Sequence, residues 1–291
     1  MNILITGCNG QLGTHLRQCE VLMPQHRFYN TDIAELDITD AQAVRAFIDS
    51  HAIDGIVNCA AYTAVDRAEN DADTAHRINA LAPELLAAAI QRRNGWMIHI
   101  STDYVFDGNS CVPYCETDTP NPTGVYGRTK LEGEQRVQKA CANSVVLRTA
   151  WLYSEVGNNF VKTMLRLGSE RDSLGVVYDQ VGSPTYAGDL AQAIQTVIEQ
   201  GIRPGTYHFT NEGAVSWYDF TKAIHRIAGI GTCHVRPLRS EEYPTPTRRP
   251  SYSVLDKAKF RQTYQVEIPY WEDSLGQCIA QLLKKQSAHQ P

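Results

Sequence analysis

Tyr126 and Lys130 stand four residues apart, next to a stretch, Leu131–Ala140, that favours a helix. At that spacing, two side chains share one face of a helix and their tips are neighbours. A free phenol has a pKa of about 10, and a nearby ammonium favours its ionised form. The pair therefore predicts a phenol brought toward working pH that gives a proton to an oxygen gaining charge. An exposed helical pair is the alternative, and it explains most isolated examples of this spacing.

Thr102 follows the apolar segment Trp96–Ser101, which predicts a buried strand. Ligands of doubly wound sheets bind at the carboxyl ends of strands. The Thr102 hydroxyl is therefore expected to hydrogen-bond the substrate oxygen that Tyr126 protonates, unless it merely caps the next turn. Together with Lys130, and behind the glycine-rich turn described next, these residues form a candidate hydride-transfer site.

A glycine-rich turn, Thr6–Gly13, joins the first predicted strand to the predicted helix Gln11–Cys19. Gly7 permits the tight turn, Gly10 lets a pyrophosphate approach the backbone, and Gly13 lets the helix pack on the strand. The free N–H groups of the helix then face the phosphates. Glycines also simply punctuate turns, but their placement between strand and helix predicts a dinucleotide-binding site.

Asp32 ends the predicted second strand, about 20 residues after Gly13, where a carboxylate usually binds the adenosine ribose and repels a 2′-phosphate. The turn residues Cys8, Asn9 and Gln11 include no Arg or Lys to receive that phosphate. We therefore predict NADH as the coenzyme, with NADPH as the less favoured one. A loop residue or a helix cap is the alternative interpretation of Asp32.

These residues belong to short apolar segments that alternate with helix-length segments. The alternation predicts an α/β fold with a doubly wound, Rossmann-like parallel sheet. We expect residues 1–150 to form the dinucleotide-binding domain and residues 151–291 mainly a smaller C-terminal substrate-binding lobe, with later segments completing the sheet. Ala72–Arg93 is expected to be a helix that Pro83 kinks or restarts. Val176–Tyr178 and Thr206–Phe209 are expected to be strands.

Composition excludes several classes of function. The 291 residues carry a formal net charge of −5 and no basic run, so nucleic-acid binding is not expected. No apolar run approaches the roughly 20 residues of a membrane span, and the eight cysteines form no CxxC pair. We therefore expect a cytoplasmic protein with reduced thiols, no membrane partner and no metal site.

The glycine turn, the strand-end threonine and the Tyr126/Lys130 pair resemble the extended short-chain dehydrogenase/reductase family. Longer blocks resemble the dTDP-4-dehydrorhamnose reductases within it. These blocks are Ser101–Gly108, Tyr126–Glu134, Arg148–Tyr153, Asn159–Val161, Asp179–Thr185 and Arg249–Asp256.

The resemblance implies reduction of the 4-keto group of dTDP-4-dehydro-6-deoxy-L-mannose to dTDP-L-rhamnose by NAD(P)H. Tyr126 would protonate the C4 oxygen, Lys130 would hold the nicotinamide ribose and tune Tyr126, and Thr102 would polarise the carbonyl. The residues at positions of coenzyme contact are Gly10, Gln11, Leu12, Asp32, Asp37, Ile38, Ala60, Ala61 and Thr63, and Tyr126 and Lys130 are expected to contact the coenzyme as well. Those at positions near the sugar are Thr102, Asp103 and Trp151.

Two alternative functions and the oligomeric state stay open. Another nucleotide-sugar reductase or epimerase would use the same scaffold, and a regulatory subunit of methionine adenosyltransferase resembles the family without catalysing its reaction. Some family members dimerise around magnesium held by carboxylates, one of them early in the first helix. His15 stands in that region here and is a poor ligand for a hard cation, so the resemblance implies no metal and leaves a homodimer open.

Overall fold

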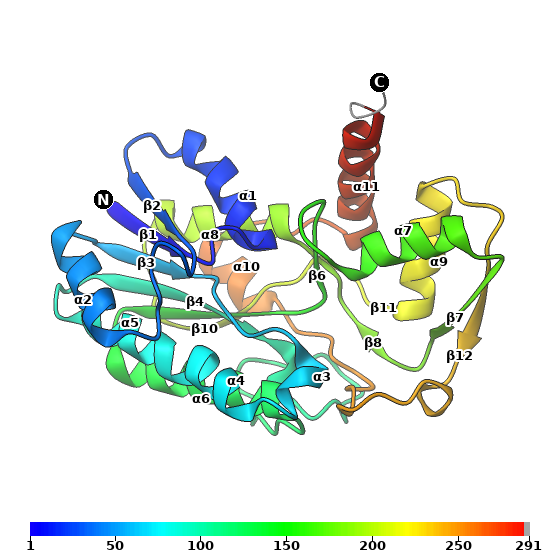
Figure 1. Cartoon of the computed structure of the whole chain (residues 1–291), viewed down its shortest axis with the longest axis horizontal. Coiled ribbons are helices and arrows are strands. Elements are labelled where there is room, and N and C mark those ends of the chain that lie inside the picture. Colours follow the sequence, from blue (N-terminus) through cyan, green and yellow to red (C-terminus); the bar gives the residue numbers. More distant parts are fainter. Residues whose placement is uncertain (288–291) are drawn as a thin grey trace.

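The computed structural model describes residues 1–287 of the chain, and the side chains of residues 1–284. Its central feature is a sheet of six parallel strands in the order β10-β5-β4-β3-β1-β2 (Figure 1). The order runs outward in opposite directions from β1 and β3, which makes the edge between them the switch point where ligands of such sheets bind. The predicted doubly wound α/β class is therefore confirmed. The strands are β1 (Asn2–Thr6), β2 (Arg27–Thr31), β3 (Gly55–Asn58), β4 (Trp96–Thr102), β5 (Ser144–Thr149) and β10 (Gly205–His208).

Helices cover both faces of the sheet because successive strand residues point to opposite sides. Ile3 and Ile5 of β1 face one core, which α1, α8 and α10 complete, whereas Leu4 faces the other, which α2, α5 and α6 complete (Figure 1). These helices are α1 (Gln11–Cys19), α2 (Ala41–Ser50), α5 (Ala82–Gln91), α6 (Val125–Ala140), α8 (Ala187–Gln200) and α10 (Ala258–Tyr264). Shorter helical segments are η1 (Glu20–Leu22), α3 (Val65–Ala68), η3 (Asp103–Val105) and η4 (Ser240–Glu242).

The segment predicted as one helix over Ala72–Arg93 is interrupted. It consists of α4 (Ala72–His76), a π-helical turn η2 (Arg77–Leu81), and α5, which has Pro83 in its first turn. Proline supplies no backbone N–H and crowds the preceding turn, so the wider turn accommodates it. The expectation that Pro83 would kink or restart the helix is confirmed.

A second group of elements lies beside the sheet and has its own apolar core. Its helices are α7 (Phe160–Glu170), α9 (Trp217–Ile227) and α11 (Trp271–Ser287). Its short strands pair as β6 (Leu152–Tyr153) with β9 (Thr185–Tyr186), β8 (Val181–Gly182) with β11 (Val215–Ser216), and β7 (Ser173–Val177) with β12 (His234–Leu238).

Two expected strands differ at their ends. β7 begins three residues before the predicted Val176–Tyr178, because Leu174 and Val176 alternate with exposed residues and form a half-buried strand. β10 ends one residue before Phe209. β10 is a strand of the six-stranded sheet, and α8 and α10 pack against that sheet, although all three follow residue 150. Residues 288–291 of the predicted second lobe lie outside the described residues. The division at residue 150 stays a prediction.

Within residues 1–287, no helix has both the length and the apolar character needed to cross a membrane.

Candidate active site

A cavity of about 760 Å³ opens where strands β1, β3, β4 and β5 end. All the residues predicted to hold coenzyme or substrate lie on its wall, although they come from distant parts of the sequence. The predicted coenzyme residues there are Gly7, Gly10, Gln11, Leu12, Gly13, Asp32, Asp37, Ile38, Ala60, Ala61 and Thr63. The remaining predicted residues there are Thr102, Asp103, Tyr126, Lys130 and Trp151. The structure brings the whole predicted set together, while their individual roles stay predictions.

Two of the three glycines in the turn are required by the fold itself. Gly7 has a left-handed backbone (φ +64°), and a Cβ there would lie 2.8 Å from the backbone nitrogen of Ala60. A Cβ at Gly13 would lie 2.4 Å from the carbonyl oxygen of Gly7. Gly10 differs, because its φ is −72° and a Cβ there would come no closer than 3.3 Å to its nearest neighbour, the Gly7 oxygen. The protein nearly accommodates a side chain at Gly10, which fits a glycine kept for close approach of a ligand.

This difference gives a paired prediction. Gly10→Ala will keep the melting temperature close to that of the unmodified protein but weaken NADH binding by about tenfold or more, a loss of about 1.4 kcal/mol. Gly13→Ala will instead destabilise the fold by about 1–3 kcal/mol, as overpacking does. Thermal unfolding and calorimetric titration with NADH measure the two effects. Unchanged NADH affinity in Gly10→Ala would show that no ligand approaches this glycine.

The two predicted acidic residues are fixed by backbone hydrogen bonds. Oδ2 of Asp32 accepts from the Asn9 N–H at 3.1 Å, which holds the carboxylate beside the glycine turn. Oδ1 of Asp37 accepts from both the hydroxyl (2.7 Å) and the N–H (2.9 Å) of Thr39, and these bonds lower the pKa of Asp37. Asp40, and no other acidic residue of this segment, caps α2. The cavity wall therefore carries two carboxylates in fixed positions, where the adenosine part of the coenzyme is predicted to bind.

Tyr126 lies in the first turn of α6 and is 9% exposed. Burial raises its pKa, and a hydrogen bond with the Thr102 hydroxyl opposes part of the rise. The expectation that Lys130 brings this phenol toward neutral pH is therefore wrong. The reason is orientation, because Nζ of Lys130 donates to the carbonyl oxygen of Ile100 at 2.6 Å. Tyr126 stays protonated near neutral pH, which is the form that a proton donor needs.

Lys130 shares the buried face of α6 with Tyr126 and is 2% exposed. Burial lowers its pKa from 10.5 to about 8, although Glu134 and Cys59 act in the opposite direction. Glu134 is itself paired with Arg148, at 2.7 Å between Nη2 and Oε2. The Lys130 ammonium therefore loses its proton near pH 8, which is within the pH range where catalytic groups commonly titrate.

Thr102 ends β4, as predicted, and has two local partners. Its Oγ1 accepts from the Tyr104 N–H at 3.2 Å, so the capping alternative also holds. The same hydroxyl donates to Oδ1 of Asp103 at 3.0 Å. Burial raises the pKa of Asp103 to about 6, against the lowering effect of hydrogen bonds from Ser253 and Thr102. Thr102, Asp103 and Tyr126 thus form one buried polar group at the end of a sheet strand.

Trp151 has an unusual backbone and a partner that sequence reasoning missed. Its φ of +48° lies in the left-handed region, which costs a non-glycine residue about 1–3 kcal/mol. Its indole stacks on that of Trp217, the first residue of α9, with ring centroids 3.4 Å apart and planes at 7°. A Cβ at Gly182 would lie 2.6 Å from Cε2 of Trp151, so this neighbour must be small. The fold thus holds one tryptophan at the cavity in a strained conformation.

Sequence reasoning also missed Gly157 and Asn158, which line the cavity from the segment between β6 and α7. The sequence feature that could have indicated this segment is Asn159, a residue type that often begins helices. Its side chain accepts from the Lys162 N–H and caps α7. Within residues 1–287, no group of three or more His, Cys, Asp and Glu side chains could hold a metal ion.

Comparison with known proteins extends over nearly the whole chain. A family model described as the RmlD substrate binding domain matches residues 1–284. A dTDP-4-dehydrorhamnose reductase of Aggregatibacter actinomycetemcomitans is 42% identical over 283 residues, which cover 94% of this chain and 96% of that protein.

Two solved structures are similar throughout. The crystal structure of a dTDP-4-dehydrorhamnose reductase from Clostridium acetobutylicum has a TM-score of 0.93 at 44% identity and covers 97% of this chain and 100% of that one. A dTDP-4-dehydrorhamnose reductase from Bacillus anthracis, solved in complex with NADP, has a TM-score of 0.92 at 39% identity. It covers 96% of this chain and 99% of that one.

Proposed function

The chain belongs to the dTDP-4-dehydrorhamnose reductase family, and we propose that its cavity carries out this reduction with Tyr126 as the proton donor. The protein is an NAD(P)H-dependent oxidoreductase that reduces the 4-keto group of dTDP-4-dehydro-6-deoxy-L-mannose and so forms dTDP-L-rhamnose. The observation that carries the assignment is that the glycine turn and the Thr102, Tyr126 and Lys130 side chains line one cavity.

Bound reduced coenzyme supplies the hydride that adds to C4 of the sugar. The chain's own task is to deliver one proton to the oxygen that becomes negative. Tyr126 breaks its O–H bond and gives that proton to the C4 oxygen, and the resulting phenolate regains a proton from water. The Thr102 hydroxyl, which donates to Asp103 at 3.0 Å in this structure, turns its hydrogen to the same oxygen and stabilises the charge that develops there.

Lys130 is proposed to hold the nicotinamide ribose through its ammonium group. Its 2.6 Å bond to Ile100 already fixes the amine at the end of β4. Asp103 and Trp151 are proposed to hold the sugar, one by hydrogen bonding and the other by its flat apolar surface. Residues 151–291 are proposed to supply most of the remaining substrate contacts.

The function is tested by following NADH oxidation with the dTDP-linked keto sugar and identifying the product. We expect NADH oxidation that depends on this sugar and dTDP-L-rhamnose as the product. A C4 epimer of that product would instead favour a related nucleotide-sugar enzyme. Copurification with a synthetase, without turnover of any keto sugar, would favour the non-catalytic alternative.

The position of Asp32 predicts the coenzyme. We expect a higher kcat/KM with NADH than with NADPH, because the Asp32 carboxylate would repel a 2′-phosphate. Asp32→Asn will raise kcat/KM for NADPH relative to NADH by about tenfold, equivalent to removing about 1.4 kcal/mol of repulsion. Steady-state kinetics with both coenzymes measure the ratio. A large advantage for NADPH in the unmodified enzyme would contradict the prediction. The two coenzymes must be compared directly, because the relative from Bacillus anthracis was solved in complex with NADP.

We also propose that the enzyme works in the cytoplasm. The thiols of Cys8, Cys59 and Cys141 are free, which fits a reducing compartment. A homodimer stays a prediction.

A further inference from the structure

The segment 154–159, called here the β6–α7 loop, contributes Gly157 and Asn158 to the cavity wall. It follows Trp151 and β6 directly, and it ends at the cap of α7. Gly157 in this loop has φ +67°, and a Cβ there would lie 3.4 Å from Cγ of Gln11 in the glycine turn. The loop and the predicted coenzyme turn are therefore in close contact.

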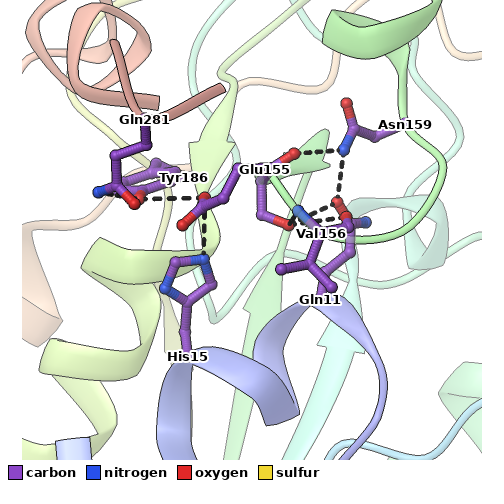
Figure 2. Close-up of polar contacts among 8 residues, drawn as sticks. Gln11, His15, Glu155, Val156, Asn159, Tyr186 and Gln281 are labelled. Carbon is purple, nitrogen blue, oxygen red and sulfur yellow. Dashed lines mark hydrogen bonds and ion pairs between the residues drawn. The ribbon is translucent and has the colours of Figure 1, made fainter. Parts of the chain in front are cut away.

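The first attachment of this loop is the side chain of Gln11. Its Oε1 accepts from Nδ2 of Asn159 at 2.9 Å, and it shares the Ser154 hydroxyl, 3.2 Å away, with the Val156 carbonyl oxygen, which lies 2.9 Å from that hydroxyl (Figure 2). Nδ2 of Asn159 also donates to the Ser154 carbonyl oxygen at 2.6 Å. One carboxamide thus binds both ends of the loop. Because Gln11 is the first residue of α1, its backbone belongs to the helix end that faces the predicted phosphates.

The second attachment is one turn further along α1, on the same face of the helix. Nε2 of His15 lies 3.2 Å from Oε2 of Glu155, and these side chains are only 5% and 1% exposed. The Tyr186 hydroxyl donates to the same carboxylate oxygen at 3.3 Å, and Gln281 of α11 donates to that hydroxyl at 3.3 Å (Figure 2). A buried carboxylate is costly without such partners, so Glu155 is held firmly.

These contacts join the coenzyme side of the cavity to the segment that carries Trp151. We propose that Gln11 and Glu155 are positioning residues that couple coenzyme binding to sugar-nucleotide binding through the β6–α7 loop. Gln11 holds the loop in one position, so coenzyme that contacts the glycine turn and a second ligand that contacts the loop both stabilise the same arrangement. The identity of that second ligand rests on the proposed function.

Coupling of this kind is reciprocal and commonly changes affinity by about 5–150-fold. The experiment titrates dTDP into the full-length protein by calorimetry, with and without saturating NADH, so that no turnover occurs. In the unmodified protein, we expect NADH to tighten dTDP binding by about fivefold or more. In Gln11→Leu, which removes the acceptor, the ratio of the two dTDP affinities will fall to about one, at an NADH concentration that a separate titration shows to saturate the variant.

A merely structural role would lower both dTDP affinities together and leave their ratio unchanged. Ser154→Ala removes one of the two donors to Gln11, together with the bonds between the Ser154 hydroxyl and the Val156 backbone, and we expect a partial loss of the ratio. Glu155→Gln, which keeps the shape but removes the charge, is expected to lower the ratio as well. Glu170→Gln breaks the exposed ion pair with Arg166 on α7 and serves as the control with an unchanged ratio.

The inference would be overturned by a ratio of one in the unmodified protein, or by an unchanged ratio in both Gln11→Leu and Ser154→Ala. Failure of the proposed function looks different. A protein that shows the coupling but does not turn over the keto sugar would contradict the proposed reaction and support the coupling.

Discussion

Tyr126→Phe will lower kcat for the keto-sugar reduction by about 10²–10⁴, the usual contribution of a positioned general acid. The phenyl ring keeps the apolar packing of Tyr126 against Ala68 and Ala75 and its edge contact with Tyr104, so the fold will persist. NADH affinity will change little, since the variant loses only the hydroxyl. Stopped-flow or steady-state NADH oxidation gives kcat, and calorimetry gives the affinity.

Tyr153→Phe is the matched control for this experiment. Tyr153 is also a buried tyrosine whose pKa burial raises, but it lies in the second core and not on the cavity wall. We expect it to change kcat by less than about tenfold, as for a residue that makes no transition-state contact. A Tyr126→Phe enzyme that retains most of the rate would show that another group donates the proton.

Lys130→Met will reduce kcat/KM for NADH by about 10²-fold, because it removes a buried charged donor next to the reacting centre. The methionine has a similar length and no charge, so it fills the space, although the carbonyl oxygen of Ile100 loses the hydrogen bond from Lys130. Steady-state kinetics measure the loss, and thermal unfolding checks that the variant folds. A variant with unchanged kcat/KM would remove Lys130 from the proposed mechanism.

The same lysine predicts a pH dependence. Burial lowers the pKa of Lys130 to about 8, so the ammonium is present below that pH and is lost above it. If the ammonium holds the coenzyme, kcat/KM for NADH will fall above about pH 8, since this parameter reports groups of the free enzyme. Tyr126 will not contribute near neutrality, because its pKa is raised. Lys130→Met will lack the decline near pH 8, whereas a decline that persists in the variant would assign it to another group.

Features set by local sequence were predictable. Gly7 and Gly13 stand where the turn geometry demands glycine, and Thr102 ends a strand that its apolar residues define. Tyr126 and Lys130 share a helix face because they are four residues apart, and no distant contact alters that spacing. The parallel sheet was also predictable, because the alternation of strand-length and helix-length segments can be read along the sequence.

Features set by contacts between distant segments were not predictable. Nothing near Trp151 in the sequence indicates that Trp217 stacks on it, or that its backbone is left-handed. The direction of the Lys130 amine depends on the carbonyl of Ile100, 30 residues earlier, and this contact overturned the expected effect on Tyr126. The attachment of Glu155 to His15 likewise joins segments that only the fold brings together.

The most direct test of the proposed mechanism uses NADH that carries deuterium at the transferable position of its nicotinamide. The enzyme is given the dTDP-linked 4-keto sugar, and the product is analysed by mass spectrometry and NMR. Direct transfer in the cavity predicts dTDP-L-rhamnose with a single deuterium on C4 of the sugar. Oxidised coenzyme with an unlabelled sugar, or deuterium on any other carbon, would contradict it.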